Sequence, residues 1–164
     1  MFHRSERLFL RPAFPEDCAA VLAGINDEAV VRNLARAPWP YRMEDAQAFA
    51  ALPQDPRLPH FVVTLPGIGV IGSAGMGEHE GQPEIGYWIA REHWGRGYAT
   101  EAAGAVLRIA RTLGHTRLGA GHFADNPASG RVLCKLGFAP TGRKVRRFSL
   151  ARGGERGAAG FLGR

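Results

Sequence analysis

The chain has 164 residues, 45% of them hydrophobic and 22% charged, with a formal net charge of +6 at pH 7. This length and composition are typical of a soluble globular protein, and no apolar run is long enough for a membrane span or a signal peptide. We therefore predict one domain over residues 1–164, located in the cytoplasm. Cys18 and Cys134 lie far apart and without metal-ligand spacing to the histidines, which predicts free, mostly buried thiols and no metal site.

The excess positive charge belongs to the C-terminal segment 143–164. This segment holds seven cations and one anion, Glu155, whereas the other 14 cations and 14 anions of the chain cancel. A solvated basic tail is the simplest interpretation, and contact with ribosomal RNA or another nucleic acid, or with an anionic ligand, stays an alternative. The seven cations are Arg143, Lys144, Arg146, Arg147, Arg152, Arg156 and Arg164.

The first third of the chain predicts one strand followed by three short helices. Residues 5–11 alternate apolar and polar side chains, which is typical of a strand. A proline and two acidic residues then begin a helix over 15–25, a second helix follows Asn26, and a third spans 43–52. Residues 37–42, APWPYR, contain two prolines and are predicted to form a loop.

The middle of the chain predicts three successive strands, 60–65, 69–75 and 84–90, with turn residues between them. Strands joined by such short turns pair antiparallel. The alanine-rich segment 99–113 places its apolar residues on one stripe and is predicted to be a helix that ends at Gly114.

The last part predicts a strand, a helix and a doubtful final strand. Residues 117–124 form a weak strand because two glycines interrupt it, and Asn126 is a typical N-cap for the next helix. Residues 148–150 are a candidate strand. The end, GGERGAAGFLGR over 153–164, has five glycines and few apolar residues, so a further strand is doubtful there.

The junction between the strand 84–90 and the helix 99–113 reads WGRGYA. Gly95 and Gly97 allow the backbone to close around an anion without a Cβ in the way, and Arg96 adds charge. Backbone N–H groups at a helix N-terminus lack intrahelical acceptors and lie at the positive end of the helix dipole. The spacing lacks the Gly-Lys-Ser/Thr of a P-loop and the third glycine of a dinucleotide site. The junction therefore predicts a phosphate site that is not an ATP or NAD site.

Three blocks of the sequence, in order, resemble the GNAT superfamily of N-acyltransferases. Residues 94–99 are similar to its acetyl-coenzyme A motif, Gln/Arg-x-x-Gly-x-Gly/Ala, with Trp94 in place of the first residue. Residues 126–138 resemble its N-x-x-S-x-x-V-L-x-K-L-G-F helix. SERLFLRP, 5–12, is similar to the N-terminus of the branch that includes the RimJ/RimL ribosomal-protein N-terminal acetyltransferases.

The resemblance implies an α/β GNAT fold, with a mostly antiparallel, splayed mixed sheet of about six to seven strands flanked by helices. It implies that acetyl-coenzyme A binds in the splay as cosubstrate. Main-chain groups of the strand 84–90 would pair with the pantetheine arm, the amides of the glycine turn would hold the pyrophosphate, and an asparagine side chain would contact the cofactor. The implied residues are Tyr87, Trp88, Ile89, Gly95, Arg96, Gly97, Tyr98, Ala99, Thr100 and Asn126.

Simpler roles stay open for some of these side chains. Those of Tyr87 and Trp88 would serve strand packing alone, and that of Asn126 would only cap its helix.

The resemblance also implies direct attack of a neutral primary amine on the thioester in a ternary complex. An α-amino group with pKa ~8 is about a tenth neutral at pH 7, against roughly 0.04% for a lysine near pKa ~10.4. A peptide or protein N-terminus is therefore slightly favoured over a small-molecule amine as acceptor.

The usual proton donor and base of the family are missing from their places. Many relatives carry a tyrosine seven places after the motif asparagine, where this chain has Leu133, and some carry a glutamate where it has Gly121. Ser129 is the substitute candidate for the acid and Glu84 for the base. A capping role for Ser129 and an exposed strand-end carboxylate for Glu84 are the alternatives.

Trp39 and Tyr41, in the proline loop, are candidates to line the acceptor site, and aromatic packing within the loop is the alternative. Two other functions stay open: a coenzyme A binding module with little turnover, and a ribosome- or RNA-associated protein that uses the basic tail. The C-terminal segment is also a candidate for a homodimer contact.

Overall fold

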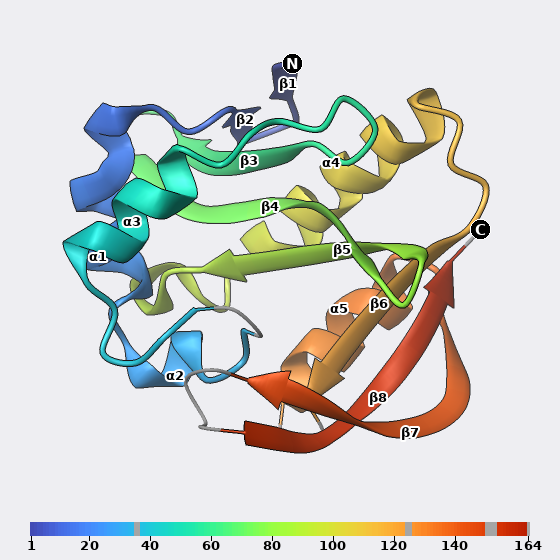
Figure 1. Ribbon diagram of the computed structural model, residues 1–164. Helices are drawn as coiled ribbons and strands as arrows, with labels where there is room; N and C mark the ends of the chain where they lie inside the picture. The colour runs from blue at the N-terminus through green and yellow to red at the C-terminus, as the bar shows by residue number, and fades with distance from the viewer. Residues whose placement is uncertain (35–36, 124–125, 150–153, 164) are drawn as a thin grey trace.

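The computed structural model describes residues 1–34, 37–123, 126–149 and 154–163. They form a mixed, mostly antiparallel sheet of eight strands in the order β1-β2-β3-β4-β5-β6-β8-β7, with helices on both faces (Figure 1). The predicted α/β class is confirmed, and the sheet is larger than the predicted six to seven strands.

The strands are β1 (His3–Arg4), β2 (Phe9–Arg11), β3 (His60–Leu65), β4 (Gly69–His79), β5 (Gln82–Ile89), β6 (Leu118–Phe123), β7 (Ala139–Ser149) and β8 (Gly154–Gly163). The helices are α1 (Cys18–Ile25), α2 (Glu28–Val31), α3 (Met43–Ala50), α4 (Tyr98–Thr112) and α5 (Pro127–Lys135), and two 3₁₀ turns are η1 (Pro15–Asp17) and η2 (Arg91–His93).

The N-terminal elements differ from prediction in their bounds. Of the strand predicted over 5–11, only Phe9–Arg11 forms a strand, because residues 5–8 make a turn in which Ser5 N donates to the Leu8 carbonyl at 2.9 Å. This turn joins β2 to β1, which pairs with it antiparallel. The second helix begins after Asp27 rather than Asn26, because the Asp27 carboxylate accepts a hydrogen bond from Ala29 N at 2.9 Å.

The predicted antiparallel meander of β3, β4 and β5 is confirmed, and β3 has the predicted bounds. β4 runs four residues further than the predicted strand, to His79. Gly75 has a packing reason: a Cβ built there would lie only 2.6 Å from His60 Cα. Residues without a side chain therefore let β3 and β4 approach closely enough to pair.

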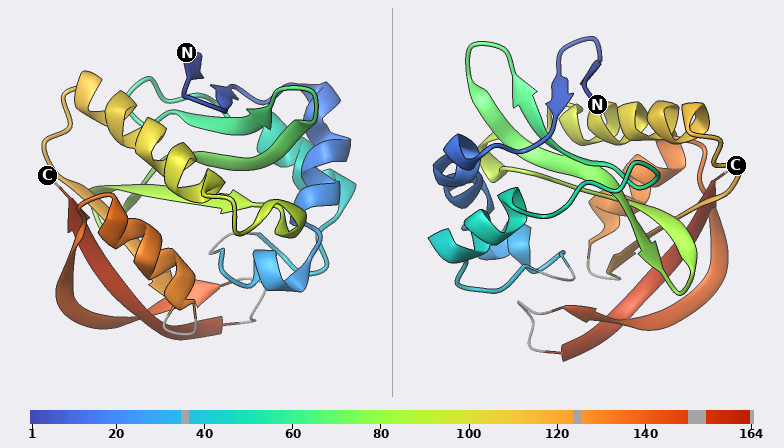
Figure 2. Two further views of the ribbon diagram at one scale, coloured as in Figure 1. Left: turned by 180° about the vertical axis from the view of Figure 1, so that it is seen from behind. Right: turned by 45° about the horizontal axis from the view of Figure 1, so that its top comes forward.

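Buried residues divide between the two faces of the sheet. Alternate residues of β3 point to opposite faces: Phe61 and Val63 join the core beneath α4 and α5, whereas Val62 joins a second cluster with α1 and α3. Figure 2 shows α4 and α5 together on one face and α1 and α3 on the other. Both layers of helices are needed to bury the two faces of the sheet. The apolar stripe of α4 predicted that this helix packs on the sheet.

β5 and β6 are parallel neighbours that pair at one register position, Glu84 with Gly119. From there the two strands diverge, as the ribbon shows (Figure 1). The predicted splay lies here, and the backbone of β5 beyond Glu84 faces the gap instead of β6.

The doubt about a final strand is wrong. β8 lies between β6 and β7 and pairs antiparallel with both. Ala158 and Phe161 are buried, at 2% and 7% exposure, and Phe161 belongs to the main core. A strand with a neighbouring strand on each side has its backbone hydrogen bonds satisfied. β8 therefore forms although its sequence offers few apolar side chains to bury.

The structure does not describe the side chains of the seven cations in the C-terminal segment 143–164. The basic tail, a nucleic-acid contact and a homodimer contact therefore stay predictions.

Both cysteines are free, but only Cys18 is buried, so the prediction is wrong for the exposed Cys134. Cys134 lies on the outward side of α5, whose inward side carries Leu133. In the described part of the chain, no helix combines the length and apolarity required to cross a membrane.

The first prediction tests the buried role of β8. Phe161→Ala should lower the free energy of unfolding by about 3 kcal/mol, because it removes a buried ring from the main core. Leu162→Ala is the control, since this neighbouring side chain points to the other face and is only half-buried. Urea denaturation measures both, and equal losses would contradict the assigned orientation of β8.

Candidate active site

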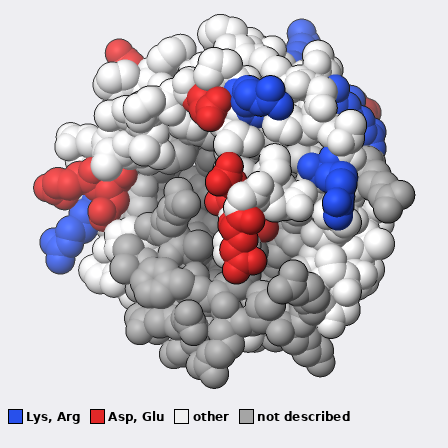
Figure 3. All heavy atoms as spheres, turned by 45° about the vertical axis from the view of Figure 1, so that its right-hand side comes forward, with Lys and Arg blue, Asp and Glu red and all other residues white. Residues whose placement is uncertain are grey.

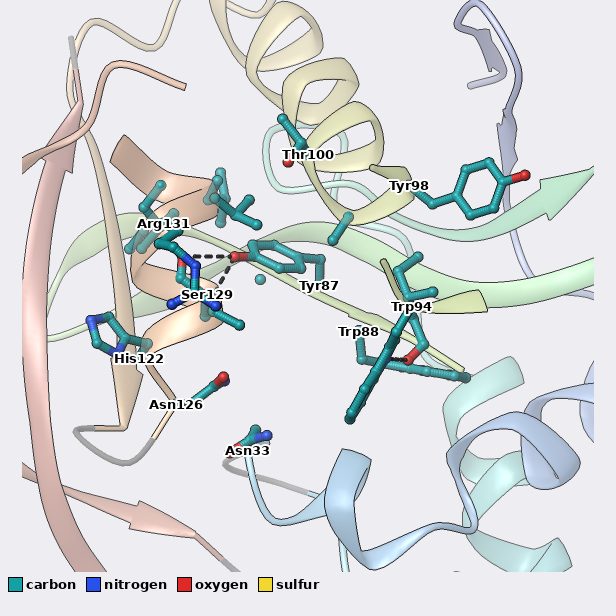
Figure 4. Close-up of a pocket in the computed structure, with 18 of the residues that line it drawn as sticks. Asn33, Tyr87, Trp88, Trp94, Tyr98, Thr100, His122, Asn126, Ser129 and Arg131 are labelled. Carbon is teal, nitrogen blue, oxygen red and sulfur yellow. Dashed lines mark hydrogen bonds between the residues drawn. The ribbon is translucent and has the colours of Figure 1, made fainter. Parts of the chain in front are cut away.

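A cleft of about 580 Å³ opens at the splay of the sheet. β5 forms one wall, β6 and the inward side of α5 form the other, and the N-terminus of α4 closes one end (Figure 4). Residues from α2 and the segment after it face the cleft from below β5. The cleft lies where the two strands have stopped pairing.

Most of the predicted site residues line this cleft. They are Glu84, Tyr87, Trp88, Ile89, Gly95, Gly97, Tyr98, Ala99, Thr100, Asn126 and Ser129. Three predicted residues are not among those that line it: Arg96, which is exposed, Trp39, which is 40% exposed, and Tyr41, which is 7% exposed and packs in the cluster with α1 and α3.

The glycine turn has the backbone conformation that its sequence requires. Gly95 and Gly97 have φ values of 75° and 79°, in the left-handed region that disfavours side chains, and α4 begins at the next residue, Tyr98. The first N–H groups of α4 have no intrahelical acceptor, and residues 97–100 line the cleft. An anion that enters this end of the cleft would meet those N–H groups.

Arg7 and Glu101 tie this turn to the N-terminal strands, a contact that the sequence analysis missed. The Glu101 carboxylate accepts hydrogen bonds from Ser5 Oγ at 2.6 Å and from Arg7 N and Arg7 Nε at 2.7 Å each. Arg7 Nη1 donates to the carbonyl of Arg96 at 2.9 Å, and the guanidinium lies over the Tyr98 ring at 4.6 Å. Both residues lie in segments that the sequence analysis considered, SER at 5–7 and TEA at 100–102, but nothing in the sequence indicates that Arg7 and Glu101 contact one another.

The hydrogen bonds to Glu101 change its acidity. Burial alone would raise the pKa of this carboxyl, but the hydrogen bonds from Ser5 and Arg7 and the charge of Arg7 outweigh burial and lower the pKa. Glu101 is therefore held as a carboxylate at neutral pH, and its contacts fix the backbone of the turn through Arg7.

Trp94, the residue that departs from the family motif, joins the turn to the end of β5. Its indole Nε1 donates to the carbonyl of Ile89 at 2.7 Å, while 46% of the residue stays exposed at the cleft. This hydrogen bond occupies one lone pair of a β5 carbonyl that was expected to face a ligand.

Tyr87 reaches across the cleft from β5 to α5. Its hydroxyl lies 2.7 Å from Ser129 Oγ and 3.4 Å from the Ser129 carbonyl (Figure 4). Burial raises the pKa of Tyr87, against an opposing effect of the Ser129 hydrogen bond, so the phenol stays protonated at neutral pH. The side chain packs against the core, as the simpler interpretation expected, and also joins the two walls.

Two asparagines, Asn33 and Asn126, line the cleft from different elements (Figure 4). Asn126 precedes α5, but its side chain makes no capping hydrogen bond, so the predicted cap is wrong and the amide is directed to the cleft. Asn33, with Val30 and Leu34, lines the opposite wall. The sequence did not predict Val30, Asn33 and Leu34 as cleft residues, because a short helical segment carries no pattern that shows which distant strand it approaches.

Glu84 lines the cleft at the point where β5 and β6 pair. A Cβ built at Gly119 would lie 3.4 Å from Glu84 Oε2, so the carboxylate extends over this glycine. The hairpin between β4 and β5 also carries exposed Glu78 and Glu80. Figure 3 turns the side of the molecule that carries this hairpin toward the viewer, and acidic side chains are gathered there.

The opposite charge lies on α5. Arg131 and Lys135 are exposed and line the cleft one helical turn apart. The cleft is thus lined by cations on α5 and by a carboxylate at the start of β5.

Comparison with known proteins identifies relatives of this chain. Residues 7–139 match the family model described as the acetyltransferase (GNAT) domain. An uncharacterized N-acetyltransferase of Bacillus subtilis is 34% identical over 148 residues, which are 84% of this chain and 82% of that protein.

Solved structures share the fold. A GNAT-family acetyltransferase of Bacillus anthracis has a TM-score of 0.83 at 24% identity, over 99% of this chain and 97% of that chain. A RimL ribosomal-protein acetyltransferase in complex with coenzyme A has a TM-score of 0.81 at 18% identity, with the same two coverages.

The second prediction concerns Glu101. Glu101→Gln should lower the free energy of unfolding by about 1–2 kcal/mol at pH 7, because the neutral amide has only one oxygen to accept from the three donors, and its NH2 group would face a donor in the other position. The folded-state pKa is lowered, so the stabilisation is complete above the ordinary pKa of 4.5 and is lost as the pH falls through the lowered value. Urea denaturation should show the difference closing in that acid range.

The control for this prediction is Glu78→Gln, an exposed carboxylate on β4. It should change the free energy of unfolding little at any pH. A difference between wild type and Glu101→Gln that stayed constant down to pH 3 would contradict the assigned role.

Proposed function

Because the chain belongs to the GNAT acetyltransferase family and is an N-acetyltransferase, we propose that it moves the acetyl group of acetyl-coenzyme A to the primary amine of a peptide or protein N-terminus, or of a small molecule. The amine attacks the thioester directly in a ternary complex. The observation that carries the proposal is the cleft at the splay, which the N-terminus of α4 closes at one end and a carboxylate flanks near the other.

The cosubstrate fits the residues that line the cleft. The amides of residues 95–100 would hold the pyrophosphate, since two left-handed glycines keep side chains away from it. The free backbone edge of β5 at Tyr87 and Trp88 would pair with the pantetheine arm, and Asn126 would contact it from α5. Arg131 and Lys135 favour the further negative charge that coenzyme A carries.

Glu84 is the proposed general base, acting directly or through one water. The acceptor arrives mostly as an ammonium ion and must lose a proton before its nitrogen can attack. Glu84 lines the cleft, and the exposed Glu78 and Glu80 add negative charge on the same hairpin. A negative surface near the cleft attracts a cationic acceptor and repels an anionic one.

Ser129 is the proposed proton donor to the departing thiolate. Its hydroxyl lies at the first turn of α5 inside the cleft, whereas Leu133, which lines the same wall, has no proton to give.

The acceptor would lie between β5 and the segment after α2. Val30, Asn33 and Leu34 line that wall, which supports them ahead of Trp39 and Tyr41 as contacts of the acceptor. An apolar wall with one amide suits an extended chain end whose first side chains are uncharged. The RimL structure, which belongs to an acetyltransferase of ribosomal proteins, supports a protein N-terminus as the first acceptor to try.

The third prediction tests this function with a panel of acceptors. Release of coenzyme A thiol from acetyl-coenzyme A should rise with peptides that have a free N-terminus and not with the same peptides acetylated at that end. Small amines such as spermidine form the second arm. Coenzyme A binding without thiol release for any amine would contradict the enzyme and leave a binding module.

The fourth prediction tests the base. Glu84→Gln should lower kcat by about a hundredfold without weakening the binding of coenzyme A, because the amide cannot accept the proton of the amine. Glu78→Gln is the matched control on the neighbouring strand and should keep kcat within about twofold. Steady-state thiol release and calorimetric binding measure the two effects, and an unchanged kcat for Glu84→Gln would exclude this carboxylate.

A further inference from the structure

We infer that Tyr87 and Ser129 form a two-hydroxyl proton relay, in which Ser129 protonates the departing thiolate and Tyr87 restores the proton of Ser129. This inference rests on the proposed acetyl transfer and adds a residue on β5 to it. Tyr87 acts through Ser129: it supplies a proton to the serine and does not itself meet the departing thiolate.

The first support is the geometry of the two hydroxyls. The oxygen atoms lie 2.7 Å apart, within the usual range for a hydrogen bond between hydroxyls. They belong to elements far apart in the chain, 42 residues from one another, which meet only across the cleft. The contact is therefore a product of the fold and not of local backbone structure.

The second support is the identity of the partners of the Tyr87 hydroxyl. The two partners found near it, the Oγ and the carbonyl oxygen of Ser129, belong to the same residue. Either hydroxyl can be the donor in the 2.7 Å contact, so a proton can pass between them in the direction that the relay needs. When Tyr87 donates to Oγ, the hydrogen of Ser129 is left to reach a group in the cleft.

The third support is the acidity that such a pair needs. An alcohol alone is a poor acid for a thiolate, whose conjugate acid has a pKa of about 8.5 in a cysteine-like thiol. A phenol, with a pKa near 10, is a far better source of a proton than an alcohol. Burial raises the pKa of Tyr87 above that ordinary value, so the phenol holds its proton at neutral pH and passes it to Ser129 only as the serine gives its own proton to the thiolate.

The relay balances as follows. The amine nitrogen forms a bond to the acetyl carbon, the carbon–sulfur bond breaks, and its electron pair stays on sulfur. Sulfur takes the Ser129 proton, Ser129 takes the Tyr87 proton, and the phenolate regains a proton from water. The proton lost by the amine passes to Glu84 and then to water, so that the net products are the amide and the free thiol.

Other hydroxyls that line the cleft are less suited to this role. Thr100 and Tyr98 lie on the first turn of α4, at the end proposed for the pyrophosphate, and the Tyr98 ring lies against the Arg7 guanidinium. Figure 4 shows the Tyr98 hydroxyl directed away from Ser129, and the Tyr87 hydroxyl directed to it.

The test compares Tyr87→Phe, Ser129→Ala and the double variant. We expect kcat for thiol release to fall about tenfold or more in Tyr87→Phe and about a hundredfold in Ser129→Ala. The double variant should be no slower than Ser129→Ala, because both residues act in one chain of proton transfers. Ser129→Thr keeps the hydroxyl and should restore most of kcat. Coenzyme A affinity should stay within a few-fold throughout, as measured by calorimetry.

A second acyl donor separates proton supply from mere positioning. Acetyl-selenocoenzyme A releases a selenolate, which is a much better leaving group than a thiolate and needs no proton to depart. The loss of kcat in Tyr87→Phe should therefore shrink with the selenoester, whereas a purely structural role would give the same loss with both donors.

The outcomes distinguish the relay from the activity on which it rests. A wild-type enzyme that releases no thiol with any amine overturns both. A wild-type enzyme that turns over while Tyr87→Phe keeps its kcat, or losses that add in the double variant, or equal losses with both donors, overturns the relay alone.

Discussion

The separation of β5 from β6 is the constraint on which the rest of the structure depends. The two strands pair at Glu84 and Gly119 and then diverge, so that beyond Glu84 β5 pairs with β4 on one edge and has no partner strand on the other. A buried backbone edge must find hydrogen bonds elsewhere, and an extended ligand that lies along it is one way to supply them. The cleft, its volume and the acyl-donor site proposed within it all follow from this divergence.

Two sets of contacts hold the ends of the cleft in place. At one end, Arg7 joins Glu101 to the carbonyl of Arg96, which couples the N-terminal strands to the glycine turn. Across the middle, Tyr87 and Ser129 join β5 to α5. The Tyr87–Ser129 contact and the Glu101 carboxylate are partly withdrawn from water, where a hydrogen bond is stronger and more costly to lose than at the surface, whereas Arg7 is exposed. They give the splay fixed walls, as a site for an oriented reaction requires.

The sequence and the tertiary structure agree best where local chemistry decides the conformation. The glycine turn, the amphipathic stripe of α4 and the strand β3 could all be read from spacing alone, because left-handed glycines and hydrophobic periods act within a few residues. Agreement is poorer at β8, where pairing with β6 and β7 overrides a glycine-rich sequence, and at Asn126, whose favoured capping bond is not formed. Two things are not local properties of the sequence: the pairing of distant strands, and whether the Asn126 side chain caps its helix or faces the cleft.

By itself, the sequence determined the fold class, the family and the position of the glycine turn, since these rest on short motifs whose chemistry is local. Only the tertiary structure decided which side chains share the cleft. It brought Asn33 and Leu34 to the wall where Trp39 and Tyr41 were expected, and it placed the Tyr87 hydroxyl on Ser129. The physical reason is that a catalytic contact depends on distances between elements far apart in the chain, and these distances are set by how two packed layers cover one diverging sheet.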